Sequence, residues 1–140
     1  MINKIADIND VDNLFELNKA LGNETTKENM KDSIANNNHE IVCIAYIDNV
    51  AVGYCVGLII KSICHRNCRV DIESLFVRDE YRKKGIGKAL IEFVEKEASI
   101  KKIKHFHINT GNDNAGARAL YEKLGYTDTG EILLEKEHLP

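Results

Sequence analysis

The chain has 140 residues, enough for one domain, because domains typically run to roughly 100–200 residues. Hydrophobic residues make up 44% of it, as in an ordinary globular protein with its own core. Nineteen Lys plus Arg against 22 Asp plus Glu give a formal net charge of −3, so no overall positive field exists to collect nucleic acid or acidic membranes. We therefore expect a single domain over residues 1–140, no nucleic-acid or membrane partner, and a local site for any anionic ligand.

The four cysteines do not indicate a disulfide framework, because the N-terminus lacks the apolar stretch of a signal peptide. The longest nearly apolar stretch, residues 50–60, is much shorter than the ~20 residues that span a bilayer. A cytoplasmic protein is therefore expected. Cys64 and Cys68 have the spacing of one ligand pair, but zinc sites usually show two such pairs, so we expect a hairpin turn there and no metal.

The first part of the chain predicts a short strand and two helices. An apolar start at residues 2–6 precedes a helical pattern that ends at Gly22. Thr25 and Glu28 have the spacing of a capping box, which predicts a second helix ending at residues 36–38.

Runs of β-branched residues follow. Residues 41–47 and 50–60 predict an antiparallel hairpin, and residues 69–77 predict a further strand. Because side chains alternate along a strand, we expect Asp71, Glu73 and every second residue after them on one face. Two carboxylates would then lie on one side of the sheet.

The second half of the chain alternates helical and strand patterns, which predicts a mixed α/β fold. The expected elements are, in order, a helix that starts near Gly85, a strand over residues 103–109, a helix over residues 114–124, and two short strands over residues 126–128 and 131–136.

Residues 82–88 have the composition of an anion-binding loop between a strand and a helix. Gly85 and Gly87 allow the backbone amides to turn outward at the positive end of a helix dipole. Four basic side chains in this loop fit a ligand with several phosphates. The sequence lacks G-x-x-x-x-G-K-[ST] and the third glycine of the dinucleotide fingerprint, so neither standard nucleotide loop fits.

This loop resembles a hallmark of the GCN5-related N-acetyltransferase (GNAT) family. The family motif is R-x-x-G-x-G/A after a strand that ends in an apolar pair. Arg82, Gly85 and Gly87 match the motif, and Phe76 and Val77 match the apolar pair.

A second family element, N-x-x-A-x-x-x-Y-x-x-x-G-F, is similar to a later segment of the chain. Asn114, Ala117, Tyr121 and Gly125 match it, and Tyr126 replaces the usual Phe. Both elements occur in the family's order, so the resemblance covers most of the chain, with only the N-terminal helices weakly matched.

The resemblance implies a fold and an activity. The fold would be a central, mostly antiparallel twisted sheet of six to seven strands, flanked by about four helices and splayed between strands 4 and 5. The activity would be direct transfer of an acetyl group from acetyl-CoA to an amine in a ternary complex, without a metal. Family members are often dimers, which leaves a homodimer open.

The resemblance also implies how acetyl-CoA binds. Its pyrophosphate would lie on the amides of residues 83–88, and the backbone of Phe76 and Val77 would pair with the pantetheine as with an added strand. Asn114 and Ala117 would line the other wall. The expected cofactor-binding residues are Leu75, Phe76, Val77, Arg82, Lys83, Lys84, Gly85, Ile86, Gly87, Lys88, Asn114, Ala117 and Tyr121.

Amine acetylation requires a base, because an alkylamine has a pKa of ~10 and must lose a proton before it attacks a thioester. Glu73 or Asp71 can take that proton, and the resemblance favours Glu73. Tyr121 stands where the family places the hydroxyl that protonates the leaving thiolate. The amide of Leu75 or Phe76 would stabilise the oxyanion.

Two further groups have less certain roles. His105 and His107 share a strand face, where a histidine can serve as an alternative base or simply pack on an exposed strand. Acidic residues at 131, 135 and 137 would suit a polycationic amine if they lie near the acceptor channel.

The expected acceptor is a small primary amine, either a polyamine or an aminoglycoside-like molecule, because residues 72–77 look similar to diamine acetyltransferases. A protein or peptide N-acetyltransferase is an alternative, and would have an open groove. A non-catalytic acyl-CoA-binding sensor is another, and would need residues 82–87 but not Glu73 or Tyr121.

Overall fold

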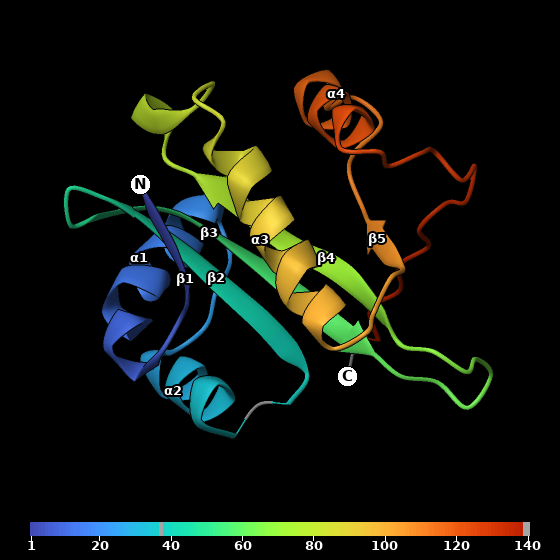
Figure 1. Cartoon of the computed structure of the whole chain (residues 1–140), viewed down its shortest axis with the longest axis horizontal. Coiled ribbons are helices and arrows are strands. Elements are labelled where there is room, and N and C mark those ends of the chain that lie inside the picture. The colour runs from blue at the N-terminus through green and yellow to red at the C-terminus, as the bar shows by residue number, and fades with distance from the viewer. Residues whose placement is uncertain (37, 139–140) are drawn as a thin grey trace. The chain divides into compact units, whose positions relative to one another are not determined.

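The computed structural model describes residues 1–36 and 38–138. The chain divides into two compact units, Met1–Asn109 and Thr110–Pro140. In the described residues, the first unit contains a five-stranded sheet and three α-helices, and the second contains one α-helix (Figure 1). The described helices are too short or too polar to cross a membrane.

The sheet has the strand order β1-β2-β3-β4-β5. The first four strands are antiparallel neighbours, and β5 pairs with β4 in parallel. The strands are β1 (Ile2–Ile5), β2 (Glu40–Ile47), β3 (Val50–Ile60), β4 (Arg69–Val77) and β5 (Phe106–Ile108).

The helices lie close to the segments that their periodicity predicted. They are α1 (Val11–Leu21), α2 (Lys27–Asn36), α3 (Ile86–Ile100) and α4 (Ala115–Lys123), with short 3-10 turns at η1 (Ile8–Asp10) and η2 (Asp79–Tyr81). The helix α1 ends at Gly22, whose φ of 103° is readily adopted by glycine. The predicted capping box at Thr25 and Glu28 is one residue early, because the Asn29 amide donates to Thr26 Oγ1 at 3.0 Å.

One face of the sheet packs tightly against α3. A Cβ added at Gly57 would lie 2.7 Å from Val70 Cγ1 and 2.8 Å from Val94 Cγ1, so this strand and this helix approach as closely as a glycine permits. Leu90 and Ile91 of α3 are fully buried. The α3 face is therefore a closed apolar layer.

The opposite face of the sheet is covered by α1 and α2. Side chains alternate along β3, so the residues next to Gly57 point toward this second face. Leu14 and Leu17 of α1 are buried in a cluster with Ile44 and Tyr54. By contrast, none of the described residues of α2 is buried. The helix α1 thus closes part of this face, and α2 covers the rest loosely.

The sheet has fewer strands than predicted. The described residues form five strands instead of six to seven, because residues 126–138 form none. Apolar alternation suggested strands there, yet Ile132, Leu133 and Leu134 are exposed. A strand needs a hydrogen-bonded neighbouring strand, and alternation of apolar residues in the sequence does not show that one is present.

Candidate active site

A β-bulge lies at Glu73, in the middle of β4. Across the β3–β4 ladder, Val56 pairs with Ser74 and Gly57 pairs with Ile72, which leaves Glu73 as the extra residue. A bulge interrupts the alternation of side chains along a strand. It sets Glu73 and Ser74 next to each other along the same cavity.

The bulge corrects the predicted faces of β4. Val77 Cγ2 lies only 3.3 Å from the Cβ position of Gly53 and so belongs to the α3 face, as Leu75 does by alternation. Phe76 instead packs against the cluster beneath α1. The prediction that Leu75 and Val77 share the face of Asp71 is therefore wrong beyond Glu73, because the extra residue reverses the alternation.

The edge of β4 opens just after the bulge. The short strand β5 pairs only with Val70, Asp71 and Ile72 among the described residues. From Glu73 to Val77, no described strand lies along that edge, so the sheet is splayed there. Backbone groups at such an edge can pair with an extended ligand.

The loop after β4 leads into the N-terminus of α3. Lys83 and Gly85 have positive φ values of 62° and 82°, and Gly85 is the N-cap of the helix. Within the described chain, no side chain accepts a hydrogen bond at this cap. Because the first amides of a helix lack intrahelical partners, they remain suited to an anion.

The basic side chains of this loop have different partners, so they do not converge on a single position. Arg82 Nε donates to the Val77 carbonyl oxygen at 2.9 Å, and its guanidinium lies 2.8 Å from Asp79 Oδ1. Arg82 therefore ties the loop to the end of β4. Lys84 lies over the ring of Tyr81, with 5.6 Å between the ammonium nitrogen and the ring centroid.

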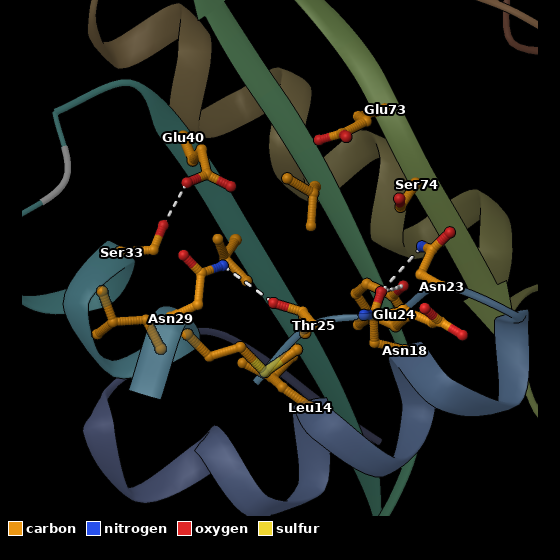
Figure 2. A pocket seen from close by; sticks show the side chains of 15 residues that line it. Leu14, Asn18, Asn23, Glu24, Thr25, Asn29, Ser33, Glu40, Glu73 and Ser74 are labelled. Carbon is orange, nitrogen blue, oxygen red and sulfur yellow. Dashed lines mark hydrogen bonds between the residues drawn. The ribbon is translucent and has the colours of Figure 1, made fainter. Parts of the chain in front are cut away.

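A cavity of roughly 440 Å³ opens on the α1–α2 face, beside the bulge (Figure 2). Its walls come from α1, α2 and the segment between them, and from β2, β3 and β4. Its apolar lining consists of Leu14, Met30, Ile34, Val42 and Val56.

The cavity is acidic. Glu24, Glu40 and Glu73 line it, and none of its described lining residues is Lys, Arg or His. Partial burial raises the pKa of the Glu73 carboxyl, and the negative charge of Glu40 raises this pKa further. A carboxylate with a raised pKa is a better proton acceptor, so Glu73 stays the candidate general base of this cavity.

Tyr54 also belongs to this cavity, although the sequence reasoning missed it. Its hydroxyl donates to Asn18 Oδ1 at 2.6 Å, and Asn23 Nδ2 donates to the same oxygen at 2.9 Å. Burial raises the pKa of the Tyr54 hydroxyl. The available signal was a hydroxyl within the otherwise apolar run of residues 50–60.

Asp71, the other candidate base, is not among the described residues that line the cavity. Its carboxylate accepts a hydrogen bond from Arg69 Nε at 2.8 Å, and His107 Nδ1 lies 3.8 Å from it. The two histidines contact each other, with 3.0 Å between the Nε2 atoms of His105 and His107. These groups form a separate polar set at the start of β4.

The remaining predicted site residues lie in the second unit. Asn114 is the N-cap of α4, and its Oδ1 accepts a hydrogen bond from the Ala117 amide at 3.2 Å. Tyr121 lies on α4, and its ring contacts that of Tyr126 edge to face at 6.3 Å between centroids. Glu73 and Tyr121 belong to different units, so their joint action stays a prediction.

Cysteines and metal ligands do not converge in the described residues. Cys64 and Cys68 are free thiols in the turn between β3 and β4. Cys43 and Cys55 are also free thiols, which are buried and lie opposite each other in the β2–β3 register. No group of three or more His, Cys, Asp or Glu side chains in the described chain could hold a metal ion.

The sequence profile of the acetyltransferase (GNAT) family matches residues 8–126, which is most of the chain. The chain therefore belongs to the GNAT family, whose members are acetyl-transferring enzymes that use acetyl-CoA. The family and enzyme class predicted from the two motifs are confirmed.

Several named relatives are similar in sequence. N-acetyltransferase 8 of Homo sapiens is 31% identical over 88 residues, which are 63% of this chain and 39% of that protein. Aminoglycoside N(6')-acetyltransferase type 1 of Salmonella typhimurium is 24% identical over 109 residues, 76% of this chain and 75% of that protein. Spermine/spermidine N(1)-acetyltransferase of Bacillus subtilis is 28% identical over 69 residues, 49% of this chain and 45% of that protein. The match thus spans less than half the length of the human and Bacillus relatives.

Solved structures show the same fold. An aminoglycoside acetyltransferase from an uncultured soil metagenomic sample, in complex with sisomicin, has a TM-score of 0.86 at 16% identity over 99% of this chain and 96% of that chain. AAC(6')-Iy, in complex with a bisubstrate analog of CoA and acetylneamine, has a TM-score of 0.86 at 20% identity, covering 99% and 98%. The predicted α/β fold, splayed between β4 and β5, is confirmed, with fewer strands than expected.

Proposed function

We propose that the protein transfers an acetyl group from acetyl-CoA to a primary amine of a small polycationic molecule, a polyamine or an aminoglycoside-like compound. The observation that carries this proposal is the position of Glu73. It lines an acidic cavity and is the first residue of the open edge of β4. A base and a place for an extended donor are thus adjacent on one strand. The family match runs through both units, which supports treating residues 1–140 as one acetyltransferase domain.

The first unit has the features that acetyl-CoA needs. The backbone of residues 75–77 lies on the open edge of β4, where it pairs with the pantetheine. The amides of residues 83–88, at the start of α3, hold the pyrophosphate, and the positive φ of Gly85 suits that turn. Acetyl-CoA supplies the acetyl group as an activated thioester.

The side chains then move protons. Glu73 accepts a proton from the acceptor amine, which frees the nitrogen lone pair for attack. The nitrogen attacks the thioester carbon, and the amide of Leu75 or Phe76 stabilises the oxyanion that forms. As the carbon–sulfur bond breaks, Tyr121 gives its hydroxyl proton to the departing sulfur, and the second proton lost by the nitrogen replaces the one that Tyr121 gave. The second family motif assigns Asn114 and Ala117 to acetyl-CoA binding as well. The acidic cavity favours a small cationic acceptor over a peptide, which would need an open groove.

Free-thiol release from acetyl-CoA tests this proposal, with polyamines, aminoglycosides, amino sugars and short peptides as acceptors. We expect turnover with a polycation, and Glu73→Gln should lower kcat about 10²–10⁴-fold while calorimetric CoA affinity is kept. Glu28→Gln on α2 is the matched control, because it removes a carboxylate that does not line the cavity. Tight CoA binding without any turnover would support the sensor alternative, and no CoA binding would contradict the donor site.

A further inference from the structure

Resting on the proposed function, we infer that the acceptor is a linear aliphatic diamine or polyamine, and that Glu40 holds its second ammonium group while the reacting amine lies at Glu73. Glu40 is thereby the residue that determines acceptor specificity.

Glu40 and Glu73 approach the cavity from two strands that are not neighbours. Glu40 is the first residue of β2, Glu73 lies on β4, and β3 runs between them. Adjacent strands are ~4.8 Å apart, so β2 and β4 are roughly 10 Å apart. The register places Glu40 across from Leu58 and Asp71, so Glu73 is also offset from Glu40 along the strand direction. Figure 2 shows both carboxylates reaching into the same opening. The cavity therefore presents two negative ends with a gap between them.

The surface across this gap is apolar. The register places Val42 of β2 opposite Val56 of β3, and Val56 opposite Ser74, next to the bulge. Met30 and Ile34 of α2 line the same cavity. An apolar floor between two carboxylates fits a chain of methylene groups with a cation at each end.

Several polar groups of the cavity already bond to one another. Asn29 Nδ2 donates to Thr25 Oγ1 at 2.9 Å, and both Tyr54 and Asn23 donate to Asn18 Oδ1. A sugar ring would have to compete with these bonds, and it would lose water from its hydroxyls over the apolar floor. An aliphatic chain has no hydroxyls to desolvate, so the apolar part of the lining, which includes Val42 and Val56, favours a polyamine over an aminoglycoside.

The helix α2 sets the position of Glu40. Ser33 Oγ on α2 donates a hydrogen bond to Glu40 Oε1 (Figure 2). This contact orients the carboxylate and leaves its negative charge in place, and the charge is what attracts an ammonium group. The charges of Glu40 and Glu73 repel each other in the free protein, and a dication relieves this repulsion.

Putrescine and butylamine are the matched acceptors for a test, because they have the same carbon chain and differ by one amino group. We expect the wild type to have a kcat/KM for putrescine at least about tenfold above that for butylamine. Glu40→Gln should raise the KM for putrescine about tenfold with little change in kcat, so that the putrescine-to-butylamine ratio falls toward one. Glu28→Gln should leave the ratio unchanged.

Ser33→Ala provides a second variant of the same contact, and it should lower the ratio by less than Glu40→Gln does. Thermal melting of both variants checks that they are folded. An unchanged ratio in Glu40→Gln would overturn the inference, as would a wild type that acetylates sisomicin far better than any linear diamine. Failure of the proposed function looks different, because no amine would then be acetylated.

Discussion

The two faces of the central sheet are built in opposite ways. On the α3 face, Gly57 lets the helix approach until Val94 nearly touches the strand, and Leu90 is fully buried. On the other face, α2 buries none of its described residues, and a cavity of roughly 440 Å³ remains beside it. Tight packing on one side thus supports the strands whose other side carries charged groups.

The difference originates in the two helices. The helix α3 has apolar residues three or four apart along 15 residues, which gives a continuous buried stripe. The helix α2 has ten residues and only Met30 and Ile34 pack against the core cluster. A weakly anchored helix leaves space and brings polar side chains such as Ser33 to the cavity. Tight packing is therefore concentrated on the α3 face, and the proposed acceptor site lies on the other face.

The largest expected effect on stability is at the α3 face. Leu90→Ala should lower the free energy of unfolding by about 2–5 kcal/mol, because it opens a cavity in a closed layer. Ile34→Ala on α2 removes a partly buried side chain and should cost less than about 2 kcal/mol. Urea denaturation measures both. Equal losses would contradict the contrast between the two faces.

Gly57→Ala tests the close approach itself. The added methyl group would lie within 3 Å of Val70 Cγ1 and Val94 Cγ1, so we expect a loss of about 1–3 kcal/mol from overpacking. Gly116→Ala on α4 is the control, because a Cβ there meets nothing within 4 Å and alanine favours a helix. That variant should be neutral or slightly stabilised in the same denaturation assay, and an equal loss at both glycines would count against close packing.

The smallest expected effect is a shift in the pH dependence of kcat/KM, which tests the acidic cavity on the α1–α2 face. A base must be unprotonated, so kcat/KM falls as the pH falls through the raised pKa of Glu73. Glu40→Gln removes a negative charge that raises this pKa, so the acidic limb of the pH profile should move to lower pH. Glu24 and Asp71, the other acidic groups near this cavity and on β4, are unchanged in the variant.

The matched variant for this shift is again Glu28→Gln, which should leave the acidic limb in place. A limb that does not move in Glu40→Gln, measured with butylamine as the acceptor, would argue that another group is the base. His107 and Asp71, which lie 3.8 Å apart, would then be the groups to replace.

Much of the secondary structure could be predicted from the sequence. The strands over residues 50–60 and 69–77 have the bounds that their composition indicated, because β-branched runs and turns are local signals. The bulge at Glu73 could not be predicted, since it depends on pairing with β3. The predictions of strands over residues 126–128 and 131–136 were wrong for a related reason. Alternation of apolar residues along one segment does not show whether a neighbouring strand is there to pair with it.

The candidate site, too, has features that the sequence predicted and features that only the tertiary structure revealed. By itself, the sequence determined the family. It also predicted an anion-binding loop at residues 82–88 and Glu73 as a candidate base, because each prediction depends on residues close together in the chain. Only the tertiary structure decided that Glu40 and Tyr54 share a cavity with Glu73 and that Asp71 lies outside it. These residues come from separate strands, and their side chains meet only when the register of the sheet is set.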